Sequence, residues 1–264
     1  SGITGNSTWN TGVSMVDINQ DGWLDIYVCS VVGIHGFKGH NELYINQKDG
    51  TFKESASDYG LAIQNYSTSA AFFDFDKDGD LDLYLLNHGV HKTSTYGVNI
   101  NRKESNEMSS DKLFENREGK FVDVTALANL STKGIGFGLA VSIGDLNSDG
   151  WDDLYVSNDF YEDDYLYINQ KDGTFKEEGH DQLSQTSQFS MGNDIADINH
   201  DGLLDIISLD MLPEDEKVLK SSLGEVSISS LRRKRQLGYQ DQFPRNHLQI
   251  NTGQNKFLEI GLLS

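Results

Sequence analysis

Cysteines, long apolar runs and long helical patterns are scarce in this sequence, and each scarcity excludes or disfavours a type of structure. The 264 residues include one cysteine, Cys29, so no internal disulfide can form, and its place in the apolar run DIYVCSVV indicates a buried strand residue. No apolar run approaches the ~20 residues that a membrane-spanning helix needs, so we expect no such segment. Long helical patterns are also rare, and 26 Gly with 11 Tyr and 13 Phe favour many short strands and tight turns.

Basic residues are scarce as well. The chain has 21 Lys and Arg against 41 Asp and Glu, which gives a formal net charge of −20. Such a charge repels nucleic acid and anionic membrane surfaces, so we expect neither as a partner. Much of the acidic excess lies in four short segments, which makes metal cations the natural counterions.

Those four segments share one pattern, D-x-[DN]-x-D-G-x-x-D. It is clearest in DFDKDGDLD at 74–82 and recurs as DINQDGWLD at 17–25, DLNSDGWDD at 145–153 and DINHDGLLD at 197–205. Side-chain oxygens at positions 1, 3 and 5, a carbonyl at 7 and a carboxylate at 9 supply the six or seven oxygens that Ca²⁺ prefers. No thiolate or imidazole set suggests zinc. The EF-hand is excluded, because position 12 of each segment is Val28, Leu85, Val156 or Ser208.

We therefore predict about four Ca²⁺ ions, one in each acidic loop. The predicted ligands are Asp17, Asn19, Asp21, Trp23 and Asp25; Asp74, Asp76, Asp78, Asp80 and Asp82; Asp145, Asn147, Asp149, Trp151 and Asp153; and Asp197, Asn199, Asp201, Leu203 and Asp205. Asp, Asn and Gly are also ordinary turn residues, but four copies in one register favour the metal site over a plain turn.

Each acidic loop belongs to a unit of four predicted strands, named A to D in chain order. Strand A precedes the loop, strand B follows it, and a hairpin supplies C and D. The hairpin LYINQKDGTFKE occurs unchanged at 43–54 and 166–177, with weaker copies from Leu113 and Leu248. Its Asp-Gly centre predicts a type I′ turn. Repeated four-stranded antiparallel units are typical of β-propeller blades.

The predicted architecture is an all-β propeller segment spanning 1–264. We expect blades at about 1–59, 60–127, 128–181 and 182–264, with a partly helical insertion at about 210–245. Length varies only between strands B and C, so the acidic loops should lie at the end opposite the variable connections. We expect the four blades to be part of a larger ring, though four blades closing on themselves stays open.

The loops and their flanking strands resemble the FG-GAP or VCBS repeats of integrin-α-type propellers. STSAAFFDFDKDGDLDLYLLNH, NDFYEDDYLYIN and DMLPEDE further resemble bacterial VCBS-repeat proteins related to cartilage acidic protein, often surface lipoproteins of Bacteroidota. The resemblance implies a seven-bladed, calcium-binding propeller that is exported to the cell surface or outer membrane, and it implies no known reaction.

Three other features have competing interpretations. The cluster at 232–235, Arg-Arg-Lys-Arg, is expected on a solvated helix face paired with carboxylates, with partner docking as the alternative. The turn at 158–165, NDFYEDDY, could hold a sugar, but a solvated acidic turn is favoured. The histidines His35, His40, His88 and His91 could form a second metal or catalytic site, although scattered loop histidines are usually solvated.

The favoured function is a non-enzymatic module in which calcium is structural. It would bind a protein or glycan with the face formed by its B-to-C and D-to-A connections. The alternative is a polysaccharide-active lyase or hydrolase with its site on that face, since fold does not dictate function. A third possibility is a structural subunit of an outer-membrane transporter assembly.

Overall fold

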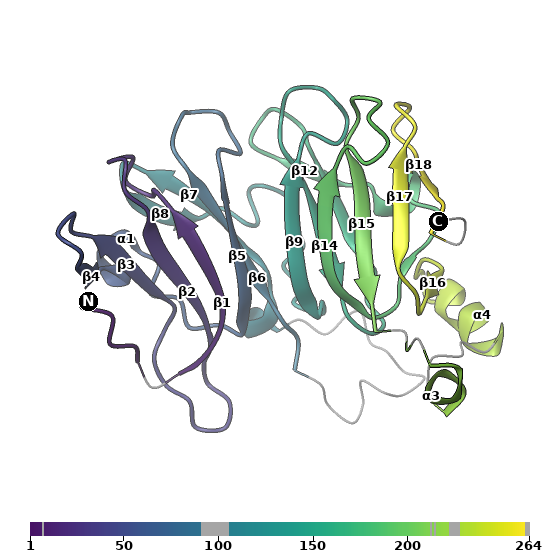
Figure 1. Ribbon diagram of the computed structural model, residues 1–264, viewed down its shortest axis with the longest axis horizontal. Helices are drawn as coiled ribbons and strands as arrows, with labels where there is room; N and C mark the ends of the chain where they lie inside the picture. The colour runs from purple at the N-terminus through teal and green to yellow at the C-terminus, as the bar shows by residue number, and fades with distance from the viewer. Residues whose placement is uncertain (7, 91–105, 212, 214, 222–227, 262–264) are drawn as a thin grey trace. The chain divides into compact units, whose positions relative to one another are not determined.

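The computed structural model describes residues 1–6, 8–90, 106–211, 213, 215–221 and 228–261 (Figure 1). His91 therefore lies outside the described residues, as do parts of the predicted insertion. Within the described residues, no helix is long and apolar enough to span a membrane.

Sixteen of the strands form four antiparallel sheets of four strands each, in chain order. The first sheet has β1 (Trp9–Val16), β2 (Asp25–Val31), β3 (Glu42–Asn46) and β4 (Phe52–Glu54), and the second has β5 (Ser67–Phe73), β6 (Asp82–Asn87), β7 (Lys112–Arg117) and β8 (Lys120–Asp123). The third has β9 (Gly138–Gly144), β10 (Asp153–Asn158), β11 (Tyr165–Asn169) and β12 (Phe175–Glu177), and the fourth has β14 (Ser190–Ala196), β15 (Asp205–Asp210), β17 (His247–Asn251) and β18 (Phe257–Glu259). This up-and-down order is that of a propeller blade, which confirms the predicted all-β fold class.

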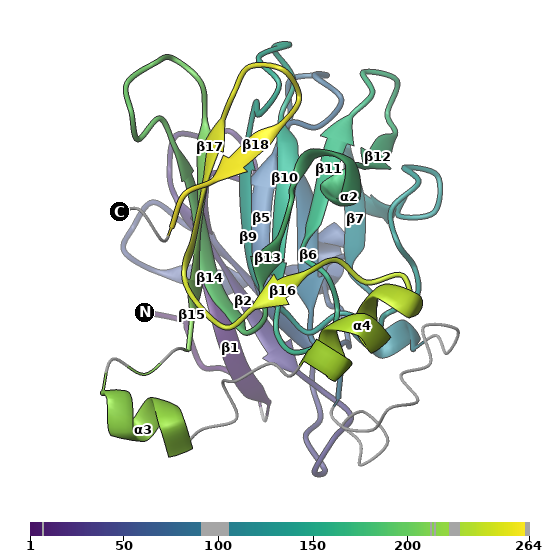
Figure 2. The ribbon, with the colours of Figure 1, turned by 90° about the vertical axis from the view of Figure 1, so that its right-hand side faces the viewer.

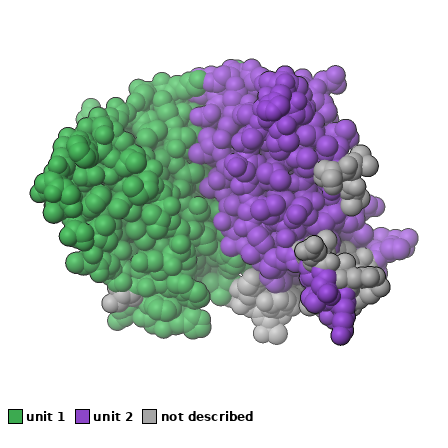
Figure 3. All heavy atoms as spheres, in the orientation of Figure 1, with its two compact units in different colours: residues 1–138, 171–174 green, residues 139–170, 175–264 purple. Residues whose placement is uncertain are grey.

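The chain divides into two compact units (Figure 3). The first comprises residues 1–138 and 171–174, and the second comprises 139–170 and 175–264. The first two sheets belong to the first unit. The last two belong to the second, apart from the boundary residue Gly138 and the hairpin tip at 171–174.

Each unit has a core between its two sheets. In the first unit, Tyr27, Cys29 and Leu43 of the first sheet pack with Leu83 and Leu85 of the second, and all five are fully buried. In the second unit, Tyr155, Leu166 and Ile168 pack with Ile206 and Phe257. The prediction that Cys29 is a buried strand residue is confirmed, and its burial raises the pKa of its thiol to about 12.

Within the described residues, helical structure is confined to short segments. The described helices are α1 (Ala56–Tyr59), the 3-10 turn η2 (Glu107–Ser109), α2 (Gly179–Gln182), α3 (Glu216–Ser221) and α4 (Ile228–Gln236). The last two lie in the insertion predicted at about 210–245. After α4, β16 (Gln242–Phe243) pairs in parallel with β13 (Thr186–Ser187), as Figure 2 shows.

The predicted type I′ turn at the Asp-Gly centre is wrong for the two identical hairpins. In the first hairpin, the Gln47 N–H donates to the Thr51 carbonyl, and the positive φ angles fall on Lys48 (65°) and Gly50 (85°), not on Asp49. The Asp49 carboxylate instead accepts the N–H of Thr51 at 2.9 Å, which favours a loop one residue longer. The two-residue turn with positive φ at both centres occurs at Glu118 and Gly119.

Replacing Gly50 by Ala tests this turn. No atom lies within 4 Å of the position that an added Cβ would occupy, so steric contact costs nothing and only the positive φ is strained. We expect the free energy of unfolding to fall by about 1 kcal/mol, measured by urea denaturation. The same exchange at Gly192, which has no positive φ and is equally open, is the control. Equal losses at both positions would contradict this account.

Candidate metal centres

The four acidic loops connect the first and second strands of their sheets, and all have the same backbone. The fourth residue has a positive φ in each loop: Gln20 (56°), Lys77 (62°), Ser148 (57°) and His200 (62°). The glycine at position 6 also has a positive φ, between 85° and 99°. Because side chains rarely adopt such angles without a reason, the shared pair indicates one common loop structure.

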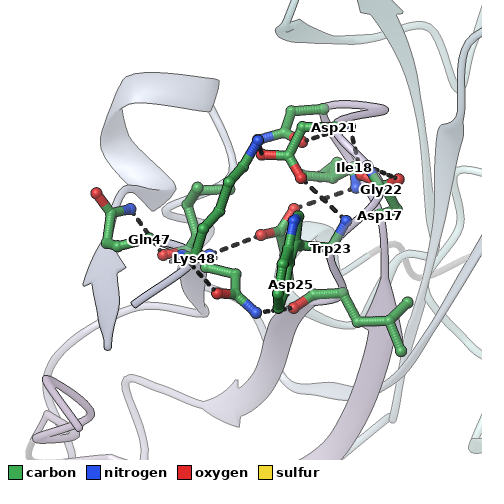
Figure 4. Close-up of polar contacts among 12 residues, drawn as sticks. Asp17, Ile18, Asp21, Gly22, Trp23, Asp25, Gln47 and Lys48 are labelled. Carbon is green, nitrogen blue, oxygen red and sulfur yellow. Dashed lines mark hydrogen bonds and ion pairs between the residues drawn. The ribbon is translucent and has the colours of Figure 1, made fainter. Parts of the chain in front are cut away.

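Side-chain oxygens at positions 1, 3 and 5 fold inward and accept backbone N–H groups, as Figure 4 shows for the first loop. The Asp17 carboxylate accepts the N–H of Gly22 at 2.8 Å and of Asp21 at 2.9 Å, and Asp21 accepts the N–H of Trp23 at 3.0 Å. The amide oxygen of Asn19 accepts the N–H of Asp21 at 3.1 Å. The first three predicted ligands of this loop therefore converge on one side of the turn.

The aspartate at position 9 is buried and joins the loop to the third strand of its sheet. In every loop its two oxygens accept two N–H groups, one from loop position 2 and one from the last asparagine of the third strand, at 2.8–3.2 Å. These four aspartates are at most 1% exposed and are Asp25, Asp82, Asp153 and Asp205.

The asparagine partners were missed by the sequence reasoning. Each also donates its side-chain N–H to the carbonyl of loop position 8, at 3.1–3.4 Å. They are Asn46, Asn116, Asn169 and Asn251. A signal was available in the sequence, because each third strand has an Asn at the same point of the repeat.

Burial makes three of the position-9 carboxylates, those of Asp25, Asp82 and Asp153, costly to ionise. Burial raises the pKa of Asp82 to about 8 and that of Asp153 to about 7, although two N–H donors oppose the rise in each case. The pKa of Asp25 is raised by the same cause. A bound cation would reverse this effect, because an opposite charge favours the ionised form.

The second loop differs from the other three in its electrostatics. Among the described residues, Asp74, Asp76 and Asp78 form the one group of three acidic, histidine or cysteine side chains whose ligand atoms all lie within 4.8 Å of one another. One oxygen each of Asp74 and Asp80 is buried without a hydrogen-bond partner. Burial, followed by repulsion from neighbouring carboxylates, raises the pKa of Asp80. Buried carboxylate oxygens that lack a hydrogen-bond partner and lie close to like charges are suitable ligands for a hard cation.

Position 7 was predicted to supply a carbonyl oxygen. In all four loops its N–H donates to the position-5 side chain at 2.9–3.1 Å. Its side chain is not part of a shared pattern, since it is Trp23, Asp80, Trp151 or Leu203. The carbonyl ligand itself stays a prediction.

With this geometry established, comparison with known proteins gives a family match over residues 30–85 and 145–208. Both segments match the FG-GAP-like repeat. The first matched segment contains the acidic loop at 74–82. The second contains the loops at 145–153 and 197–205. The predicted resemblance to FG-GAP repeats is thereby confirmed.

Two relatives extend the comparison. An alignment of 213 positions with mouse integrin alpha-3 has 26% identity and covers 73% of this chain. This chain spans only about a fifth (20%) of the length of that relative. A solved structure whose title describes specific recognition of non-reducing terminal N-acetylglucosamine by an Agrocybe aegerita lectin aligns with 92% of this chain and 49% of its own, at 16% identity and a TM-score of 0.43.

The opposite ends of the four sheets hold a second repeated contact that sequence reasoning also missed. In each sheet the residue before the third strand accepts a backbone N–H from the last or next-to-last residue of strand B. In the first three sheets it also contacts a strand-B tyrosine hydroxyl. In the first sheet, Asn41 accepts from Ser30 N–H at 2.8 Å and donates to the Tyr27 hydroxyl at 3.1 Å. In the third sheet, Asp164 accepts the Asn158 N–H at 2.8 Å and the Tyr155 hydroxyl at 2.7 Å.

The turn at 158–165 is buried, so the favoured prediction of a solvated acidic turn is wrong. Its four carboxylate residues, Asp159, Glu162, Asp163 and Asp164, are between 1% and 7% exposed. The reason is non-local. The Gln240 N–H donates to Asp163 at 3.0 Å, and the Gln242 side chain donates to the Glu162 carbonyl at 2.7 Å. The segment after α4 therefore packs on the turn and supplies hydrogen-bond donors to two of its buried acceptors.

The basic cluster behaves as predicted at three of its four positions. Arg232, Arg233 and Arg235 are exposed, and Arg235 pairs with the carboxylate of Asp241. Lys234 is the exception, because it is 5% exposed, donates to the Gln242 side chain at 2.7 Å and lies 4.9 Å from the Tyr161 ring centroid. Burial lowers its pKa to about 8. Lys234 thus anchors α4.

The described histidines of the B-to-C connections are held by backbone groups. His40 Nδ1 lies 2.7 Å from the Asn41 carbonyl, and His88 Nδ1 lies 2.6 Å from the Gly89 carbonyl. His35 is exposed. Neither of these two contacts is the histidine–carboxylate pair from which a general base is usually built.

Proposed function

We propose that this chain is a calcium-stabilised, non-enzymatic binding module of propeller blades, with calcium at the loop end of each sheet and a ligand at the other. The observation that supports it most is the position-9 aspartate. In all four sheets this buried carboxylate connects the acidic loop to the third strand, so an ion held by the loop would stabilise the sheet itself. We expect about four ions.

The donor set favours calcium over other cations. Every predicted ligand supplies oxygen, which suits Ca²⁺ or Mg²⁺ and not zinc. An irregular loop of nine residues suits the flexible coordination of Ca²⁺ better than the strict octahedron of Mg²⁺. Two buried oxygens without a hydrogen-bond partner, on Asp74 and Asp80, support a cation in at least the second loop.

A glycan is the ligand that we propose for the other end of the sheets. Thr8, Trp9, Asn10 and Phe37 line an open hollow of about 480 Å³ where β1 begins and the connection after β2 passes. Trp9 is 55% exposed, and its ring centroid lies 6.0 Å from that of Phe37. An exposed indole beside hydroxyl and amide groups offers an apolar face and hydrogen bonds to the same ligand.

Repeat-equivalent positions support this use of Trp9. An aromatic residue stands at or just before the first residue of strand A in every sheet: Trp9, Tyr66, Phe137 and Phe189. Phe137 contacts the ring of His88 at 5.4 Å, and Phe189 contacts that of Phe160 at 5.7 Å, in each case from the sheet before. At these two positions the aromatic residue thus contacts a ring from outside its own sheet, and at Trp9 we propose that a sugar takes that place.

Replacing Trp9 by Ala tests the glycan site. We expect affinity for whichever glycan binds on an array to fall roughly tenfold or more, which corresponds to about 1.4 kcal/mol, because a central aromatic contact is lost. Titration calorimetry measures the change. Trp23→Ala is the matched control, since Trp23 is also exposed (49%) but lies in an acidic loop. A loss of equal size in both variants, or an array without any binder, would argue against the proposal.

Further proposals concern cellular context. We propose that the protein acts outside the cell or at its surface. We propose further that it is a relative of the bacterial VCBS-repeat proteins related to cartilage acidic protein, and that a lipid anchor holds it at the outer membrane of a member of Bacteroidota. A transporter assembly is a proposed partner there. Cell fractionation tests the location, and co-purification tests the transporter partner.

We also propose that the protein performs no catalysis, so incubation with acidic glycans should yield no new reducing ends or unsaturated products.

A further inference from the structure

We infer that the four loops differ in affinity and that the loop at Asp74–Asp82 takes its cation first and most tightly, with the Asp80 side chain as an additional ligand. This inference rests on the proposed function, because it supposes that the loops bind Ca²⁺. It goes beyond that function by assigning an order of binding and a residue that sets it.

The first difference lies in the side chain at position 1. In the first, third and fourth loops, one oxygen of this aspartate accepts the N–H of position 5, at 2.9 or 3.1 Å. In the second loop the corresponding oxygen of Asp74 is buried and has no hydrogen-bond partner. A ligand oxygen that no N–H has to share is available to a metal ion.

The second difference concerns the carboxylate at position 5. Its outer oxygen has a donor in each of the other loops. In the first loop, the Lys48 ammonium lies 3.2 Å from Asp21 Oδ2. In the third and fourth, the side-chain amides of Asn147 and Asn199 donate to the position-5 aspartate at 3.0 Å. The second loop has Asp76 at position 3, and a carboxylate has no N–H to donate.

The third difference is position 7. Asp80 stands where the other loops have Trp23, Trp151 and Leu203, and one of its oxygens is buried without a partner. The second loop therefore has five carboxylates, at every odd position, whereas the odd positions of each of the others have three. Calcium affinity in oxygen sites increases with the charge of the ligand set, so all three differences act in the same direction.

The test exchanges the position-7 residues of the second and fourth loops in variants of the full chain. Asp80→Leu gives the second loop the position-7 residue of the fourth, and Leu203→Asp makes the reverse exchange. Asp80→Asn keeps shape and an amide oxygen while removing the charge. Protein stripped with a chelator is titrated with Ca²⁺ by calorimetry, and circular dichroism verifies that each variant folds.

We expect the wild type to show one tight site followed by weaker ones. Asp80→Leu should weaken the tight site roughly tenfold, Asp80→Asn should weaken it less, and Leu203→Asp should add a second tight site. Four sites of equal affinity, or an isotherm that Asp80→Leu leaves unchanged, would overturn the inference and leave the calcium proposal standing. Absence of any calcium binding by the wild type would overturn both.

Discussion

Excess chelator is expected to lower the melting temperature of this protein by roughly 5–10 °C for each calcium site that is emptied. The estimate follows from mass action. An ion at 100 times its dissociation constant adds about 2.7 kcal/mol to the stability of the folded state, and 1 kcal/mol shifts the melting temperature of a domain of 150–250 residues by roughly 2–4 °C. Each compact unit has two acidic loops, so losses within a unit should accumulate.

The physical reason for this loss of stability is that, without an ion, the loops hold carboxylates close together or buried. The second loop concentrates five carboxylates, and the buried carboxyl of Asp82 has a pKa of about 8 because burial opposes its charge. Calcium favours the ionised form of such a group and is bound only by the folded loop, so its binding energy adds to folding stability.

Differential scanning calorimetry in calcium and in excess chelator measures the shift. Magnesium at the same concentration is the control, because it dehydrates reluctantly and demands octahedral geometry, so it should restore less of the lost stability. A melting temperature that is unchanged by the chelator would contradict structural calcium. Full rescue by magnesium would contradict the assignment of the ion.

The features that the sequence predicted correctly are those set by local chemistry. The alternation of turn residues with strand-forming residues placed every strand of the four sheets, because glycine at position 6 and the acidic residues around it act within nine residues. The common register of the four loops, 17–25, 74–82, 145–153 and 197–205, predicted one shared turn for the same reason, and all four have positive φ at positions 4 and 6.

The features that were missed depend on partners far away in the chain. The turn at 158–165 is acidic and was predicted to be solvated, but the donors that allow its burial, Gln240 and Gln242, are about eighty residues away. Lys234 belongs to a run of basic residues, and only its contacts with Tyr161 and Gln242 distinguish it from its neighbours. Local composition reports the average environment of a residue type, whereas burial of a charge is decided by specific partners.

Replacing Asp164 by Asn is expected to stabilise the protein at pH 8 and to flatten its pH dependence. Asp164 is 1% exposed, and burial raises the pKa of its carboxyl from 3.8 to about 7. The folded state therefore binds a proton more tightly than the unfolded state does. The stability that this gives is complete below pH 4 and is lost as the pH rises through about 7, so the wild type should be more stable at pH 5 than at pH 8.

The size of this loss of stability follows from the shift in the pKa of Asp164. A difference of about three pKa units between the folded and unfolded states corresponds to at most about 4 kcal/mol, and an uncharged amide avoids this loss. Denaturant unfolding between pH 4 and pH 8 measures it. Calcium is kept saturating throughout, so that the loop carboxylates stay ionised and do not contribute to the profile. Parallel pH profiles for Asp164→Asn and the wild type would contradict the prediction.

The first sheet provides the reciprocal control, because it already has the amide at this repeat position. Asn41 is fully buried, accepts the Ser30 N–H and donates to the Tyr27 hydroxyl, which shows that an amide can replace the carboxylate without leaving a donor unpaired. Asn41→Asp should therefore introduce the pH dependence that Asp164→Asn removes, with stability falling as the pH rises. If the two substitutions changed the slope in the same direction, burial of the carboxylate would not be its cause.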